Sequence, residues 1–169
     1  MIRLVLVDDQ ALARAGLKLI LAPEDGFQVV GEAADGAAAL AVVAEHRPDV
    51  VVMDVRMRGM DGVEATRRLK ADPHSPPVLI LTTFDDDEVL SGALRAGAAG
   101  FMLKEAPAEE LIRAVRPVAA DNPELTQDVS DMLLRGALGN DQPGGDLRVG
   151  GPLDQQGQHL QLARAERIG

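Results

Sequence analysis

The stretch Val50-Val51-Val52-Met53-Asp54 is an apolar run that ends in a carboxylate, and three other short apolar runs of the chain also end in polar side chains. Those runs are Leu4-Val5-Leu6-Val7 before Asp8-Asp9, Val78-Leu79-Ile80-Leu81 before Thr82, and Gly100-Phe101-Met102-Leu103 before Lys104. Short apolar runs separated by helix-length segments are typical of parallel strands with helical crossovers. Parallel sheets bind ligands outside the carboxyl ends of their strands, so we expect the five polar residues to meet at one edge.

The rest of the pattern predicts strands and helices in strict alternation as far as about residue 120. We expect strands at 2–7, 27–31, 50–53, 78–81 and 100–103. We expect helices at about 10–21, from the cap Asp35 to 46, from near Asp61 to 70, from the acidic run 85–88 to Gly97, and from Pro107 to 119. This alternation predicts an α/β fold, an open doubly wound sheet of five parallel strands.

Composition narrows the class of protein further. The 169 residues, 46% of them hydrophobic, are enough for one domain with a core and an appendage. The formal net charge of −10 does not favour nucleic acid as a partner. The chain has no cysteine, which excludes disulfides, thiolate metal sites and cysteine catalysis. No stretch has the length and hydropathy of a signal peptide core or a membrane span, so we expect a cytoplasmic protein without membrane contact.

The polar residues at the expected edge indicate phosphoryl chemistry. Asp8, Asp9 and Asp54 would crowd three carboxylates together, which is costly unless a cation shares the site. An all-oxygen ligand set suits Mg²⁺, and no paired histidine spacing supports zinc. Lys104 offers a compact cation and Thr82 a hydroxyl donor. Such a set suits phosphoryl transfer, in which an aspartate carboxylate can itself be the nucleophile.

These residues and two longer motifs resemble one family. The motifs are Asp54-Val55-Arg56-Met57-Arg58-Gly59-Met60-Asp61-Gly62 and Gly97-Ala98-Ala99-Gly100-Phe101-Met102-Leu103-Lys104. With Asp8, Asp9 and Thr82, they resemble the receiver domain of two-component response regulators over about residues 1–120. The amino-acid sequence of residues 53–57 and 62–69 is most similar to sequences of the NarL/FixJ (LuxR-type) subfamily. The resemblance implies a flavodoxin-like sheet with strand order 2-1-3-4-5.

The resemblance also implies a role for each site residue. Asp54 would accept a phosphoryl group from a sensor histidine kinase. Mg²⁺ would be held by Asp9, Asp54 and the backbone carbonyl of Arg56, with Asp8 assisting directly or through water. The chain would then be a phosphoacceptor regulatory domain and not an enzyme, apart from self-catalysed phosphorylation and dephosphorylation.

The remaining family positions concern the conformational response. Lys104 would pair with the phosphoryl oxygens, Thr82 would move to hydrogen-bond them, and Phe101 would occupy the aromatic switch position. A lone aromatic residue in a strand is also a common core residue, so both readings of Phe101 stay open. Two positions depart from the commonest pattern: Arg58 stands where the family often has proline, and Phe101 lacks the hydroxyl of the frequent tyrosine.

The part of the chain after residue 120 has a different character. We expect residues 121–138 to form a linker able to hold a short helix, and residues 139–169 to form a flexible or non-native tail. NarL/FixJ regulators usually carry a C-terminal helix-turn-helix, and we find no match to it here. Residues 121–169 contain four basic residues against eight acidic ones, so DNA is not an expected partner of this segment.

Three classes of function therefore compete at this point. The favoured one is a stand-alone or truncated receiver that signals through protein contacts, for which homodimerisation is open. The second is a DNA-binding transcriptional regulator whose effector domain is lost by truncation or frameshift. The third is a metal-dependent phosphohydrolase. The third is disfavoured because the acidic residue expected two positions after a nucleophilic aspartate is Arg56 here.

Overall fold

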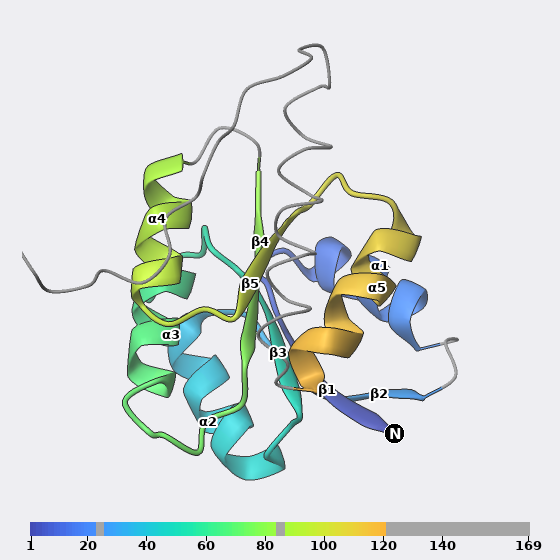
Figure 1. Ribbon diagram of the computed structural model, residues 1–169, viewed down its shortest axis with the longest axis horizontal. Coiled ribbons are helices and arrows are strands. Elements are labelled where there is room, and N and C mark those ends of the chain that lie inside the picture. The colour runs from blue at the N-terminus through green and yellow to red at the C-terminus, as the bar shows by residue number, and fades with distance from the viewer. Residues whose placement is uncertain (23–25, 84–86, 121–169) are drawn as a thin grey trace, which may run out of the picture.

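The computed structural model describes residues 1–22, 26–83 and 87–120, which form five strands and five helices in strict alternation (Figure 1). The strands are β1 (Ile2–Val7), β2 (Phe27–Ala33), β3 (Val50–Asp54), β4 (Val78–Thr82) and β5 (Gly100–Leu103). The helices are α1 (Ala11–Leu21), α2 (Gly36–His46), α3 (Gly62–Leu69), α4 (Asp87–Arg95) and α5 (Ala108–Ala119). All five strands and five helices that the sequence predicts up to about residue 120 are present.

The five strands form one parallel sheet in the order β2-β1-β3-β4-β5. Figure 1 shows the sheet between two layers of helices, with α2, α3 and α4 on one face and α1 and α5 on the other. The predicted doubly wound, flavodoxin-like order is therefore confirmed. Because all strands run in one direction, their carboxyl ends share one edge of the sheet.

Alternation along the central strands divides their side chains between the two faces. On β1, Leu4 and Leu6 join the core cluster beneath α1 and α5, whereas Val5 and Val7 join the cluster beneath α2, α3 and α4. All four side chains are fully buried. Burying one such side chain contributes about 1.5–3 kcal/mol, so the central strands form a rigid base for the residues at their carboxyl ends.

Two helix starts are fixed by aspartate caps, as the sequence predicts. Asp35 Oδ1 accepts a hydrogen bond of 2.8 Å from the amide of Ala38, and Asp61 Oδ1 accepts one of 2.8 Å from the amide of Glu64. Each carboxylate satisfies an amide that has no partner within the helix. The second cap places the start of α3 directly after the loop that follows Asp54.

The largest difference from the expected boundaries is at β2, which continues to Ala33 and does not end at Gly31. The apolar pattern of β2 fades after residue 31, but its neighbour β1 continues to Val7, and Val7 pairs with Ala33. The carbonyl of Ala33 also accepts a hydrogen bond of 3.1 Å from the amide of Asp8. Pairing with a buried neighbour therefore extends the strand beyond its own apolar run.

Smaller differences concern other termini. Pro107 occupies the N-cap position of α5 and does not lie in its first turn. The predictions for residues 85–86, the linker 121–138 and the tail 139–169 lie outside the described residues. Across the described ranges, none of the helices is both long enough and apolar enough to cross a bilayer.

Gly62 lets α3 approach the end of β3 closely. A Cβ atom added at Gly62 would lie 2.3 Å from the carbonyl oxygen of Asp54 and 2.9 Å from the Cα of Val55. The amide of Gly62 also donates a hydrogen bond of 2.9 Å to the carbonyl of Val55. Because the obstructing atoms belong to the backbone, a side chain here would have to displace the loop after Asp54.

We predict opposite effects for two glycine-to-alanine substitutions. Gly62→Ala should lower the free energy of unfolding by about 1–3 kcal/mol, because the added methyl group overpacks against backbone. Gly16→Ala should raise it by about 0.4–1 kcal/mol, because Gly16 lies inside α1 and an added Cβ would have no atom within 4 Å. Urea denaturation followed by far-UV circular dichroism measures both values. Equal effects of the two substitutions would contradict the close approach at Gly62.

Candidate functional site

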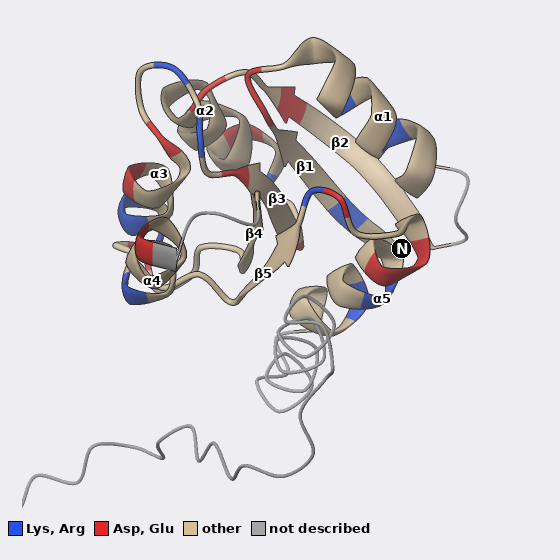
Figure 2. Cartoon of the chain, turned by 90° about the horizontal axis from the view of Figure 1, so that it is seen from above, with Lys and Arg blue, Asp and Glu red and all other residues tan. Residues whose placement is uncertain are grey.

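Three carboxylates meet at the carboxyl edge of the sheet. Asp8 and Asp9 follow β1, and Asp54 is the last residue of the adjacent strand β3. Val7 pairs with Met53, which brings the two strand ends level with each other. Carboxylate oxygens of the three residues all lie within 4.8 Å of one another. In Figure 2, red segments mark acidic residues where the chain leaves β1 and β3.

Two of these carboxylates are buried. Asp8 is 0% exposed and Asp54 is 3% exposed, whereas the side chain of Asp9 is 20% exposed. Backbone amides two residues further along hold both buried groups: Gln10 donates to Asp8 Oδ1 at 2.8 Å, and Arg56 donates to Asp54 Oδ1 at 3.3 Å. Each carboxylate thus has one oxygen bound to its own loop and the other available for a partner.

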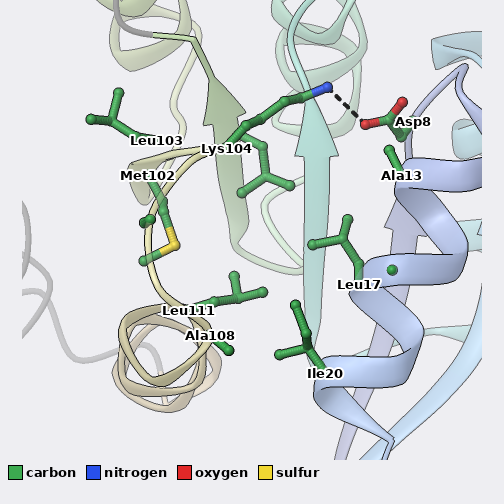
Figure 3. A pocket seen from close by; sticks show the side chains of 12 residues that line it. Asp8, Ala13, Leu17, Ile20, Met102, Leu103, Lys104, Ala108 and Leu111 are labelled. Carbon is green, nitrogen blue, oxygen red and sulfur yellow. Dashed lines mark hydrogen bonds and ion pairs between the residues drawn. The ribbon is translucent and has the colours of Figure 1, made fainter.

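Lys104 supplies that partner for both buried carboxylates. It follows β5, and its Nζ lies 2.8 Å from Asp8 Oδ2 and 3.0 Å from Asp54 Oδ2. Figure 3 shows the lysine extending across the strand ends towards Asp8. Burial by itself lowers the pKa of Lys104, but the hydrogen bonds to Asp8 and Asp54 and the negative charges of both aspartates together raise that pKa above its usual value. Lys104 is therefore a firmly charged cation.

Asp54 remains under electrostatic strain despite this partner. Burial is the largest cause that raises the pKa of the Asp54 carboxyl above its usual range. The hydrogen bond and charge of Lys104 oppose this change, while the negative charge of Asp8 adds to it. The site thus holds more negative charge than its one lysine neutralises, and a further cation would relieve it.

The donor set fits a divalent ion of the Mg²⁺ type. Three carboxylates offer hard oxygen ligands from within 4.8 Å of one another, and two of them are buried. Mg²⁺ is usually held by carboxylates together with water molecules and phosphate oxygens. The predicted ligands Asp8, Asp9 and Asp54 are therefore brought together, and Arg56 lies on the loop beside Asp54 with its amide on Asp54 Oδ1.

Asp9 differs from the other two acidic residues in its contacts. Its Oδ2 accepts a hydrogen bond of 3.3 Å from the backbone amide of Arg58 and lies 4.0 Å from Arg58 Nε. The Arg58 side chain is 97% exposed, so its charge is screened by solvent. The arginine at this position therefore still supplies a backbone donor to Asp9, which a proline could not do.

Thr82 and Phe101 lie on neighbouring strands beside the cluster. Thr82 ends β4, is buried, and donates its hydroxyl to the carbonyl of Thr83 at 3.1 Å. Phe101 on β5 pairs with Ile80 and is 6% exposed within the core cluster beneath α2, α3 and α4. The hydroxyl of Thr82 is thus bound to the backbone carbonyl of the next residue, and the aromatic ring of Phe101 is packed inward.

Sequence reasoning missed Arg14. Its Nη1 donates a hydrogen bond of 2.6 Å to the carbonyl oxygen of Asp8, and its Nε lies 3.6 Å from Glu32 Oε2 on β2. A basic residue near the start of a helix is disfavoured by the helix dipole. That unusual placement, five residues after Asp9, is the sequence signal that could have revealed it.

A groove of about 210 Å³ adjoins the cluster between α1 and α5 (Figure 3). Its walls are mostly small and aliphatic side chains, and its polar end is formed by Asp8 and Lys104. In Figure 3, Leu17 and Ile20 on α1 face Leu111 on α5 across it. The groove therefore ends at the buried Asp8 and at Lys104, on the side of the sheet covered by α1 and α5.

Comparison with known proteins agrees with this geometry. A family model described as the response regulator receiver domain matches residues 4–116. The transcriptional regulatory protein LiaR of Bacillus subtilis (strain 168) is 37% identical over 134 residues, which cover 79% of this chain and 64% of LiaR. The oxygen regulatory protein NreC of Staphylococcus epidermidis (strain ATCC 35984) is 44% identical over 117 residues, covering 69% of this chain and 54% of NreC.

A solved structure gives the same result. The crystal structure of a LuxR-family two-component response regulator from Aurantimonas sp. SI85-9A1 is 31% identical, with a TM-score of 0.68, and the match covers 79% of this chain and 99% of that chain. This chain spans between 54% and 64% of the length of the two curated relatives. The family predicted from the sequence is confirmed, and so is its likeness to the NarL and LuxR type of regulator. The chain belongs to the response regulator receiver domain family.

Proposed function

We propose that Asp54 accepts a phosphoryl group from a sensor histidine kinase and that residues 1–120 act as the receiver domain that responds to it. Receiver domains generally receive a phosphoryl group from such kinases and generally bind Mg²⁺ at an acidic pocket, and their role is regulatory. The observation that carries the proposal is Lys104 Nζ, which lies within 3.0 Å of both Asp8 and Asp54. That contact places a fixed cation beside the carboxylate that would be phosphorylated.

The transfer itself needs little covalent chemistry from the protein. An oxygen of Asp54 attacks the phosphorus, the P–N bond of the phosphohistidine breaks, and its electron pair stays on the imidazole nitrogen. Mg²⁺, held by Asp8, Asp9, Asp54 and the carbonyl of Arg56, would neutralise the phosphoryl oxygens when bound. Lys104 would move from the bare carboxylate to the phosphoryl group and keep its partner Asp8. Positioning and charge neutralisation account for most of the rate in such reactions.

Thr82 and Phe101 would carry the conformational response. The hydroxyl of Thr82 would leave the Thr83 carbonyl and donate to a phosphoryl oxygen, since a charged acceptor makes the stronger hydrogen bond. That movement would change the packing around Phe101, which is buried on the adjacent strand and has no hydroxyl of its own. Phosphorylation would thus shift a two-state equilibrium of the face formed by α4, β5 and α5.

A second candidate extends this function to transcription. LiaR is named a transcriptional regulatory protein, and this chain spans 64% of its length. The nucleotide sequence from about codon 120 onward, translated in all forward frames, tests the candidate. A helix-turn-helix in one of the frames would favour a DNA-binding regulator, and its absence would favour a cytoplasmic receiver that acts through protein partners or as a homodimer.

We predict that Asp54→Asn abolishes phosphorylation, because the amide oxygen is not a competent nucleophile. Incubation with acetyl phosphate and Mg²⁺, followed by intact mass spectrometry, measures the gain of one phosphoryl group. Asp35→Asn is the matched control: it also removes a carboxylate, its asparagine can still cap α2, and it should be phosphorylated like wild type. An undiminished mass gain in Asp54→Asn would overturn the assignment of Asp54.

The same substitution should stabilise the metal-free protein. The folded-state pKa of Asp54 is raised, so its contribution to stability is complete below the ordinary carboxyl range and is lost as the pH rises through the folded pKa. Asp54→Asn should therefore unfold at higher urea concentration than wild type at pH 7, and the difference should shrink as the pH falls to about 4. Glu45→Gln, at an exposed position of α2, should change stability by less than about 0.5 kcal/mol. A less stable Asp54→Asn at neutral pH contradicts the burial argument.

Lys104→Ala should uncouple the phosphorylation of Asp54 from the conformational response to it. The phosphoryl group would lose the cation that links it to β5, so amide hydrogen exchange in α4, β5 and α5 should no longer differ between the phosphorylated and free forms. Lys70→Ala is the control, since Lys70 Nζ donates its hydrogen bond to the carbonyl of Pro76, at 3.5 Å, and not to a carboxylate of the cluster. A variant at position 104 that still shows the full wild-type difference in exchange would exclude this role for the lysine.

A further inference from the structure

We propose that Arg14 is a positioning residue for the acidic cluster: it holds the peptide plane between Asp8 and Asp9 and thereby sets the affinity for the divalent cation. This inference rests on the proposed function. The carrying observation is the hydrogen bond of 2.6 Å from Arg14 Nη1 to the carbonyl oxygen of Asp8. The side chain of Arg14 is largely buried, with 19% of it exposed, so water competes little for that bond.

The bond acts on the peptide plane that joins the two aspartates. The carbonyl of Asp8 is coplanar with the amide and the Cα of Asp9, because the peptide bond does not rotate freely. Fixing this oxygen therefore fixes the direction in which the chain enters Asp9. The side chain of Asp8 is already held by Lys104 and by the amide of Gln10, so Asp9 depends on the plane more strongly.

Backbone hydrogen bonds hold the two ends of this short loop: the amide of Asp8 donates to the carbonyl of Ala33 at 3.1 Å, and the amide of Arg14 donates to the carbonyl of Gln10 at 3.1 Å. The loop consists of Asp8, Asp9 and Gln10 between the end of β1 and the start of α1. Gln10 occupies the N-cap position but makes no capping hydrogen bond through its side chain. Asp9 Oδ2 accepts a hydrogen bond of 3.3 Å from the backbone amide of Arg58, and the Arg58 side chain itself is 97% exposed. The Arg14 side chain therefore supplies a side-chain link from the helix to the Asp8–Asp9 peptide, in a loop whose N-cap residue makes none.

Glu32 on β2 holds Arg14 in place. Glu32 Oε2 lies 3.6 Å from Arg14 Nε, and Lys18 Nζ lies 2.7 Å from Glu32 Oε1. The hydrogen bond from Lys18 is the largest cause that lowers the pKa of Glu32, and the charge of Arg14 adds to it. Glu32 is therefore ionised at neutral pH and compensates the arginine, which the helix dipole disfavours at this end of α1. The Nε of Arg14 is buried without a hydrogen bond, so this ion pair is its compensation.

When Arg14 is replaced, the loss of its charge and the loss of its hydrogen bond to Asp8 predict opposite changes in the affinity for the cation. Removing a positive charge near a cation site should tighten cation binding by Coulomb's law. Releasing the peptide plane should weaken it, because the protein must then order Asp9 when the ion binds. Substitution of groups that orient metal ligands typically costs about 10–100-fold in affinity. We therefore expect weaker Mg²⁺ binding when Arg14 is replaced, despite the lost positive charge.

The experiment compares Arg14→Met with Lys18→Met in the full chain. Both variants remove one cation from α1 and one partner from Glu32, but only Arg14 contacts the carbonyl of Asp8. Titration calorimetry with Mg²⁺ alone measures the dissociation constant. Arg14→Met should raise it about 10–100-fold, and Lys18→Met should leave it unchanged or slightly lowered. Phosphorylation by acetyl phosphate should need more Mg²⁺ in Arg14→Met but reach the wild-type rate at saturation.

Two further variants keep the test decisive. Glu32→Gln leaves Arg14 in place but removes its compensating charge, so it should weaken Mg²⁺ binding less than Arg14→Met does. If Arg14→Met does not fold, Glu32→Gln replaces it in the titration. Arg14→Lys keeps a donor and should recover part of the affinity. An Arg14→Met protein that binds Mg²⁺ as tightly as wild type would overturn the inference, and so would an equal loss in Lys18→Met. A wild-type chain that neither binds Mg²⁺ nor is phosphorylated on Asp54 would instead contradict the proposed function.

Discussion

The ion pairs of Lys104 with Asp8 and Asp54 connect the three strands that build the site. The lysine follows β5, Asp8 follows β1 and Asp54 ends β3, so one ammonium group joins residues up to 96 positions apart in the chain. Removing the lysine would leave two buried carboxylates without a compensating charge, which is strongly destabilising. The contact is possible because all strands are parallel and present their carboxyl ends at one edge.

The same arrangement leaves the negative charge of the site only partly compensated. Two buried carboxylates share one lysine, and the raised pKa of Asp54 shows that its charged form is not fully stabilised. An ordinary core would avoid this cost, whereas functional sites commonly hold such strain. Here the strain favours the binding of a divalent cation, because its positive charge supplies the compensation that the carboxylates lack.

Around this centre, the packing leaves little freedom to the loops. Gly62 brings the start of α3 against the backbone of Asp54, and Asp61 caps that helix, so the loop after β3 is held at both ends. On the other side, Arg14 and Glu32 connect α1 and β2 to the loop after β1. Loops that carry functional residues thus obtain their geometry from the rigid elements on either side of them.

The sequence by itself determined the α/β class, the order of the elements and the polar residues at the carboxyl edge of the sheet. Apolar periodicity, helix caps and polar residues at strand ends are local signals, so they can be recognised without knowing which distant residues are in contact. Asp35 and Asp61 cap their helices as predicted, and Asp8, Asp9, Asp54, Thr82 and Lys104 all lie at strand ends. The predicted roles of these residues, and the predictions for 121–169, stay predictions. Only the tertiary structure decided that β2 extends to Ala33, that the Thr82 hydroxyl donates to the Thr83 carbonyl, and that Arg14 reaches Asp8. Those features depend on side-chain rotamers and on pairing across strands, which are fixed by contacts between distant parts of the chain and leave no periodic trace in it.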